Sequence, residues 1–251
     1  MLGKNGARTT PASGGHEQAE QAGRQAQASA GPTRHFDFSS LSGPERYRLL
    51  TSSIMPRPIA WVVTCAADGG MNAAPYSFFN VFGADPPVLA IGILPGPCGR
   101  KDTAANILAT REFVVNLVPF ALAREMSATS VEAPPEVDEL ALADLATLPS
   151  LAVRPPRIAL SPVTFECRLT HGLETGTDQF LMVGEVLHAH FAQGVLTGNP
   201  DRPRIDAAAL DLVGRMHGPA TYARTRETFE MARPAWRDSA ETQGRVDKED
   251  D

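Results

Sequence analysis

Residues 57–80 read RPIAWVVTCAADGGMNAAPYSFFN, and two strand-like halves flank a turn within this stretch. Residues 58–65 are apolar and rich in β-branched side chains, which is typical of a strand. They are followed by the turn signal Asp68-Gly69-Gly70, after which residues 71–80 resume an extended pattern. Segments joined in this way pair as a hairpin. The stretch therefore predicts an antiparallel pair near the beginning of a β-rich domain.

The rest of the chain continues this pattern. Four further strands are predicted, over residues 87–94, 112–118, 162–171 and 178–191. Three short helices are predicted, over residues 102–111, 120–128 and 137–148. Many strands, few helices and frequent proline and glycine breaks favour a mainly β fold, a closed or nearly closed antiparallel barrel with peripheral helices. A doubly wound sheet would need a helix between successive strands, and most of those helices are missing.

The two ends of the chain differ in composition from its middle. The protein has 251 residues, of which 43% are hydrophobic, but residues 1–33 are dominated by small and polar residues and contain no Phe, Tyr or Trp. Residues 233–251 are again polar and end in an acidic run. Such segments bury too little apolar surface to offset the entropy of ordering them. We expect a disordered N-terminal extension over residues 1–33, one domain over residues 34–232 and a solvated tail over residues 233–251.

Composition also argues against several classes of protein. No apolar run is long enough for a signal peptide or a membrane span, and the net charge of −6 argues against a nucleic-acid partner. Three widely spaced cysteines favour a reducing cytoplasm over a disulfide frame or a zinc site. His188 and His190 lie two apart on one predicted strand face, but no third ligand is near in sequence, so we interpret them as solvated and expect no metal. Hydrolase, P-loop and Rossmann motifs are absent from the sequence.

A short polar turn precedes the first predicted helix. Gly99-Arg100-Lys101-Asp102-Thr103 combines two cations and a hydroxyl with the free N–H groups of a helix N-terminus. These groups together suit a dianionic phosphate. The alternative is a surface helix that Asp102 caps, with two solvated cations beside it. The residues by themselves leave both interpretations open.

Three other stretches are candidates for binding. In residues 72–80, small residues stand beside aromatic ones, so a planar ring could lie against the backbone; ordinary core aromatics at a strand end are the alternative. Arg57 stands between two prolines that fix its backbone, and it could clamp an anion or pair with a carboxylate across a dimer interface. The loop over residues 213–219 offers Arg215 and His217, and His217 either faces a ligand or is simply exposed.

These stretches, in this order, resemble the flavin reductase-like group of FMN-binding split-barrel proteins. The likeness runs from about residue 47 to residue 222 and rests on RPIAWVVT at 57–64, DGGMNAAPYSFFNVFGADPPVLAIGI at 68–93, GRKDTAANI at 99–107, EFVVNLV at 112–118, ECRL at 166–169 and VGRMHG at 213–218. The resemblance implies an FMN-binding split β-barrel that forms a homodimer, with FMN near the subunit interface.

The resemblance also implies roles for single residues. Lys101, Asp102 and Thr103 match the phosphate grip, with Arg100 beside them. The segment along the isoalloxazine comprises Ala74, Pro75, Tyr76, Ser77, Phe78, Phe79 and Asn80. Arg57 and Trp61 match a strand near the cofactor, and Arg215 and His217 match a loop that approaches the flavin. His217 is the candidate catalytic side chain.

The activity that the resemblance implies is hydride transfer from a nicotinamide, NADH or NADPH, to flavin N5. In such chemistry the cofactor carries the reaction and the protein supplies position and electrostatics. We therefore expect an NAD(P)H:flavin reductase, with a monooxygenase as one conceivable partner. An FMN-binding electron carrier or flavin-holding protein without nicotinamide turnover is the alternative, and an oxidase of a pyridoxine-type phosphate ranks third.

Overall fold

The computed structural model describes residues 31–233, and the ends 1–30 and 234–251 lie outside it. The expectations of a disordered extension over residues 1–33 and a solvated tail over 233–251 therefore fall almost entirely outside the described residues. Residues 41–227 form one compact unit, and the remaining described residues belong to a second unit with the chain ends. In that second unit the Asp37 carboxylate closes a turn by accepting hydrogen bonds from the backbone N–H and the hydroxyl of Ser39.

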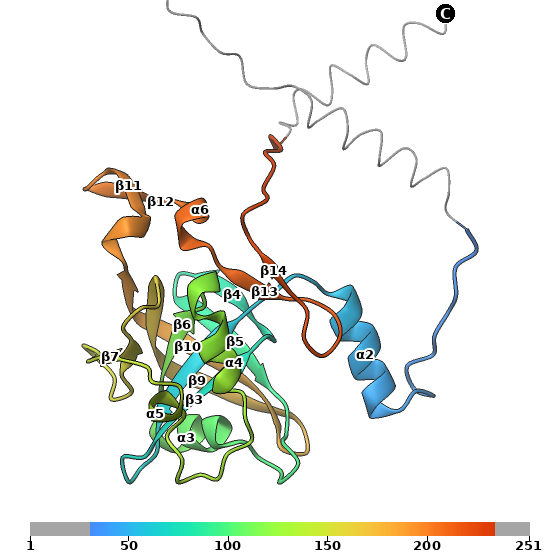
Figure 1. Ribbon diagram of the computed structural model, residues 1–251. Coiled ribbons are helices and arrows are strands. Elements are labelled where there is room, and N and C mark those ends of the chain that lie inside the picture. Colours follow the sequence, from blue (N-terminus) through green and yellow to red (C-terminus); the bar gives the residue numbers. More distant parts are fainter. Residues whose placement is uncertain (1–30, 234–251) are drawn as a thin grey trace, which may run out of the picture. The chain divides into compact units, whose positions relative to one another are not determined.

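The larger unit is built around a seven-stranded sheet in the order β3-β2-β6-β9-β10-β5-β4 (Figure 1). Its strands are β2 (Ala60–Cys65), β3 (Met71–Tyr76), β4 (Phe79–Ala84), β5 (Pro87–Ile93), β6 (Glu112–Leu117), β9 (Val163–Gly176) and β10 (Gln179–Phe191). Every neighbouring pair is antiparallel. The edge strands β3 and β4 are not hydrogen-bonded to each other, yet Tyr76 and Phe79 contact the same core. The sheet is thus a split barrel, as expected.

The hairpin predicted from the first segment is present. Ala60 pairs with Tyr76 and Cys65 with Met71, so β2 and β3 are antiparallel neighbours. The predicted strand over residues 71–80 is interrupted at Ser77 and Phe78, however, because the chain leaves β3 there and enters β4 at the opposite edge of the sheet. This break places the segment of small and aromatic residues at the open seam of the barrel.

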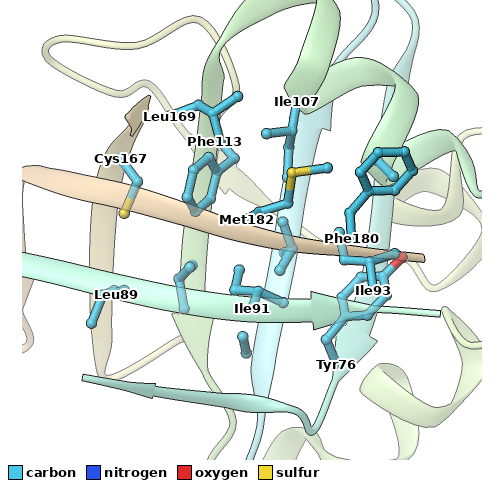
Figure 2. Close-up of a cluster of buried hydrophobic side chains, with 14 residues drawn as sticks. Tyr76, Leu89, Ile91, Ile93, Ile107, Phe113, Cys167, Leu169, Phe180 and Met182 are labelled. Atoms are coloured by element: carbon cyan, nitrogen blue, oxygen red, sulfur yellow. The ribbon is translucent and has the colours of Figure 1, made fainter. Parts of the chain in front are cut away.

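Alternating side chains of the strands build two cores. On β2, Ala60 and Val62 belong to a cluster that the strands enclose, whereas Trp61 and Val63 belong to a second cluster. This is the period of two that a strand imposes. In Figure 2 the enclosed cluster runs from Leu89 and Cys167 at one end to Tyr76, Ile93 and Phe180 at the other. The barrel is therefore filled with side chains and is not a channel.

Two of the three predicted helices are present. α3 (Asp102–Thr110) follows the polar turn and ends where Arg111 adopts a left-handed conformation with φ of 63°. Residues 120–128 form the 3-10 turn η1 (Phe120–Leu122) and α4 (Ala123–Ala128). The helix predicted over residues 137–148 is wrong beyond its first turn. It is limited to α5 (Glu139–Leu142), because Asp144 turns left-handed with φ of 51° and the chain then enters a strand.

The remaining elements surround the sheet. They are α2 (Gly43–Ser53), α6 (Ala207–Leu210), the 3-10 turn η2 (Gln193–Val195) and the strands β1 (Arg57–Pro58), β7 (Thr147–Leu148), β8 (Arg157–Ile158), β11 (Leu196–Asn199), β12 (Arg202–Ile205), β13 (Val213–Arg215) and β14 (Tyr222–Arg224). β1, β13 and β14 form a small sheet of their own, in which Arg57 lies opposite Arg215. Among the described residues, no helix has the length and apolar character that crossing a bilayer requires.

Candidate functional site

A cavity of about 420 Å³ opens between β4, β5 and the tip of the β9–β10 hairpin. Its aromatic walls are Phe78, Phe79, Phe82 and Phe180, and its polar groups are Asn80, Thr175 and Gln179. Cavities with mainly apolar walls and a few polar groups are the usual form of cofactor sites. Three residues of the predicted ring-binding segment, namely Phe78, Phe79 and Asn80, thus line one cavity.

A glycine allows one wall of this cavity to lie close to the barrel. The backbone N–H of Gly92 donates to the carbonyl oxygen of Phe78 at 2.6 Å. A Cβ atom at Gly92 would lie 3.0 Å from the Cβ of Phe78, which is closer than side chains normally approach. Gly92 therefore lets Phe78 pack directly on β5 and defines the depth of the cavity.

The polar turn over residues 99–103, which we call the cationic turn, contacts the same cavity with the side chain of Arg100. Its guanidinium carbon lies 5.0 Å from the ring centroid of Phe180, which is a cation–π contact. Its Nε lies 3.5 Å from Oδ1 of Asp178, and both side chains keep substantial exposure. Arg100 is thus a solvent-accessible cation at the rim. Phe180 and Asp178 were not predicted as site residues, although the Gly-Thr-Asp turn between two predicted strands could have indicated a hairpin tip there.

The first turn of α3 has no side-chain cap. Lys101 is the N-cap residue with extended φ and ψ, and within residues 31–233 no side chain accepts from the N–H groups that follow. Asp102 is already inside the helix, so the alternative in which Asp102 caps it is wrong. Asp138 and Asp206, by contrast, cap α5 and α6 with their carboxylates. The start of α3 therefore offers unpaired N–H groups beside two cations, as an anion site requires.

Thr103 faces the barrel and not this rim. It is 1% exposed, and its hydroxyl oxygen accepts from the side-chain amide of Asn72 at 2.8 Å. The phosphate role that was predicted for its hydroxyl is therefore not supported, although its backbone N–H remains in the first helical turn. The neighbouring Tyr76 hydroxyl is buried without a hydrogen-bond partner in the described part of the chain, and burial raises the pKa of Tyr76 to about 12.

Asp102 belongs to a second cavity, of about 400 Å³. The side chains of Asp68, Glu136 and Asp138 also line it, which makes it strongly acidic. An acidic cavity disfavours a phosphate because like charges repel. Within residues 31–233, no group of His, Cys, Asp and Glu side chains is arranged to hold a metal ion.

Arg57 lies in a buried junction beside the ring-binding segment. It is 7% exposed; its Nη1 donates to the carbonyl oxygens of Thr51 and Ile54, and its Nη2 donates to that of Met216. Its Nε donates to the hydroxyl of Ser77 at 3.3 Å. Desolvation lowers the pKa of Arg57, which nonetheless stays charged. Arg57 thus contacts the segment without lining the cavity.

Trp61 is farther from the cavity than its place in the sequence suggested. Its side chain is 0% exposed, belongs to the second core and donates from Nε1 to the Thr129 hydroxyl at 2.8 Å. Direct contact of the indole with a cofactor is therefore excluded in this arrangement. Trp61 fixes β2 and, through the pairing of Trp61 with Pro75, the neighbouring strand.

The loop after β13 is organised by Arg215. Its guanidinium donates to the carbonyl oxygens of Gly218, Pro219 and Thr221 and lies over the ring of Tyr222. His217 is exposed at the tip of this loop. Neither side chain lines the cavity of Phe78 and Phe180.

His190 and Glu166 form a pair that was not predicted. His190 Nε2 lies 2.7 Å from Glu166 Oε1, and the backbone N–H groups of Leu151 and Ala152 also donate to this buried carboxylate. The interpretation of the two histidines as simply solvated was therefore wrong for His190. This pair anchors the loop before β8 and lies outside the cavity.

The cavity and its rim fit FMN. A flat aromatic ring system needs apolar and aromatic walls, and a phosphate dianion needs cations and N–H donors at one end. Phe78, Phe79 and Phe180 supply the aromatic walls. Arg100 and the uncapped start of α3 supply the cation and the N–H donors.

Known proteins are similar to this chain over most of its length. Residues 51–226 match the flavin reductase like domain family. An uncharacterized protein of Deinococcus radiodurans is 39% identical over 206 residues, which cover 79% of this chain and 89% of the relative. Nitrilotriacetate monooxygenase component B from Bacillus cereus superposes with a TM-score of 0.75 at 29% identity, covering 80% of this chain and all of that one.

A second solved structure is similar to the same degree. The 2-nitrobenzoate 2-nitroreductase of Pseudomonas fluorescens superposes with a TM-score of 0.73 at 30% identity, covering 81% of this chain and 98% of that one. The family match spans the hairpin, the cavity walls and the cationic turn. This chain therefore belongs to the flavin reductase-like family of split-barrel proteins.

Proposed function

We propose that this protein is an FMN-dependent oxidoreductase that takes hydride from NADH or NADPH. The observation that carries the proposal is the aromatic cavity with Arg100 at its rim, since Arg100 directly precedes Lys101, the N-cap residue of α3. One site thus offers apolar walls for a ring and cationic and N–H donors for a phosphate.

Different residues would bind the ring system and the phosphate of FMN. Phe78, Phe79 and Phe180 would hold the ring system, and Arg100 and Lys101 would hold the phosphate together with the N–H groups of Asp102 and Thr103. Bound FMN supplies an acceptor for hydride at N5. The protein's part is to orient the two reactants and to place donors where negative charge develops. No side-chain acid or base is needed in the cavity.

The proposed dimer is supported by apolar side chains left in water. Val81 and Phe82 on the edge strand β4 are 64% and 68% exposed. Tyr47, Leu50 and Ile54, on or just after α2, are also exposed, and Thr51 is the one buried residue of this helix. An edge strand with exposed apolar residues is a template for association. We infer that a second copy covers this surface and completes the site near Phe82.

The similarity to a monooxygenase component B favours a role as a reductase that supplies reduced flavin to a partner. The similarity to a nitroreductase favours a second candidate, in which FMN stays bound and passes electrons directly to a small acceptor. Retention of FMN distinguishes the two roles, because a diffusible flavin is lost on gel filtration and a prosthetic one is not.

Anaerobic mixing of the protein with FMN and either nicotinamide tests the proposal. Oxidation of NADH or NADPH, followed at its absorbance band and matched by bleaching of the flavin band, is the expected result. Protein that binds FMN but bleaches it with neither donor would be a flavin-holding protein, and the proposed reductase activity would be wrong.

A further inference from the structure

Arg57 joins three separate parts of the chain around the ring-binding segment. Its guanidinium donates to carbonyl oxygens at the end of α2 and to that of Met216 after β13. Its Nε–H donates to the hydroxyl of Ser77, between β3 and β4. Four hydrogen bonds fix the orientation of the planar guanidinium. A flexible lysine side chain could not form the same set of hydrogen bonds.

The charge of Arg57 has no carboxylate partner among these contacts. All acceptors are carbonyl oxygens apart from the Ser77 hydroxyl. Arg215, directly opposite on β13, likewise uses its guanidinium on carbonyl oxygens. Like charges opposite each other on a ladder cost stability, and a buried cation without a counterion costs more. The junction therefore carries positive charge that negative charge on a neighbouring ligand would offset.

The Ser77 hydroxyl is the point of contact between the positive charge of Arg57 and the ring-binding segment. A hydroxyl has one proton and two lone pairs, and the Nε–H of Arg57 occupies one lone pair. In the described part of the chain, the Ser77 hydroxyl donates to no other group. It is partly exposed and adjoins Phe78, a wall of the cavity. Its proton is therefore directed away from the guanidinium and is available to a ligand.

We propose that Arg57 is a positioning residue that holds the Ser77 hydroxyl as a hydrogen-bond donor to the bound flavin. This inference rests on the proposed function, because it concerns the same FMN site. A donor whose oxygen already accepts from a cation is polarised and gives a stronger bond. Such a donor stabilises the ring more after reduction than before it, because reduction adds electron density to the ring. Arg57 therefore tunes the reduction potential without touching FMN.

The test is the midpoint potential of FMN bound to the full-length protein, measured in a dye equilibrium for the wild type, four variants and one control variant. Ser77→Ala is expected to lower the ratio of affinities for reduced and oxidised FMN about tenfold, or about 30 mV for a two-electron couple. Ser77→Thr keeps the hydroxyl and is expected to retain the wild-type potential. Arg57→Lys is expected to lower the potential as Ser77→Ala does, and the double variant to add nothing to Ser77→Ala.

The matched control is Arg111→Lys, because Arg111 also donates to a backbone carbonyl, that of Leu169, but lies outside the site. It is expected to leave the potential unchanged. An equal shift from Arg57→Lys with and without the Ser77 hydroxyl would overturn the proposal, since residue 57 would then act on the flavin by a route that does not pass through Ser77. An unchanged potential in Ser77→Ala would overturn it as well, even where Arg57→Lys does not fold. Protein that binds no FMN at all would instead refute the proposed function.

Discussion

The guanidinium of Arg100 lies over the ring of Phe180, 5.0 Å from its centroid, and so joins the cationic turn to the aromatic cavity. The two residues are 80 positions apart in the sequence, on a turn before α3 and on β10. This contact joins the cationic turn and the aromatic cavity, which are separate in the sequence, into one site.

In the proposed site, Asp178 would compete with the phosphate of FMN for Arg100. Its Oδ1 lies 3.5 Å from Arg100 Nε, and an exposed pair of this kind stabilises by up to about 1 kcal/mol. Asp178→Asn keeps a residue that tolerates the left-handed backbone at this position, where φ is 53°. We expect FMN to bind up to about fivefold more tightly and riboflavin to bind as before, measured by fluorescence quenching. Equal gains for both flavins would mean that Asp178 acts on the ring.

Gly92 controls the depth of the cavity. A methyl group there would lie 3.0 Å from the Cβ of Phe78 and would displace this wall. We expect Gly92→Ala to weaken FMN and riboflavin binding by the same factor, because both share the ring. Gly194→Ala is the control, since nothing lies within 4 Å of the added carbon. Wild-type affinity for both flavins in Gly92→Ala would show that the ring lies elsewhere.

The exposed side chains of β4 predict an oligomer. Phe82→Asp places a charge in the surface that we assign to a second copy, and we expect sedimentation to show a monomer where the wild type is a dimer. Leu160→Asp is the matched control, because Leu160 is 72% exposed and does not line the cavity. A wild-type protein that sediments as a monomer would contradict the proposed interface.

Glu166 makes stability depend on pH. Burial raises its pKa, but the N–H groups of Leu151 and Ala152, together with His190, outweigh burial and hold the pKa of Glu166 below its usual 4.5. A lowered pKa in the folded state stabilises the protein above the unfolded value, and this stabilisation is lost as the pH falls through the folded pKa. We expect Glu166→Gln to cost about 1–3 kcal/mol at pH 7.

Urea unfolding at pH 7 and at pH 3.5 measures this effect. The difference in unfolding free energy between wild type and Glu166→Gln is expected to shrink at the lower pH, because the stabilisation from a lowered pKa is progressively lost below the unfolded value of 4.5. A difference that stays the same at both pH values would show that the charge of Glu166 contributes nothing.

The strands could be predicted because their periodicity is local. β2 alternates between two cores, and its apolar residues and the following Asp-Gly-Gly turn are visible in the sequence. α2 was missed, although Ser42 and Glu45 form a capping box at its start. Tyr47, Leu49 and Leu50 are the only large apolar residues of α2, which is too short a pattern for a helix to be recognised from its periodicity. The exposure of Tyr47 and Leu50 is what the proposed dimer would account for.

The site could be predicted in part, because some of its residues are recognisable from local sequence. The cationic turn and the segment 72–80 carry recognisable residue types, so their candidates could be named. Which atoms face the cavity depends on long-range packing, however, and packing commits the Thr103 hydroxyl to Asn72 and the Trp61 indole to Thr129. Phe180 reaches the site because β10 pairs with β5, a strand that is distant from it in the sequence. No local pattern contains that information.

The central claim is that FMN binds with its phosphate at Arg100 and Lys101. Titration of FMN and of riboflavin into the wild type, Arg100→Ala and Lys101→Ala tests it most directly, since only FMN carries the phosphate. Arg124→Ala is the control, because Arg124 is an exposed cation on α4 that does not line the cavity. We predict that each of the two variants weakens FMN binding about tenfold or more and leaves riboflavin binding nearly unchanged. Equal losses for FMN and riboflavin, or no loss for either, would contradict the account.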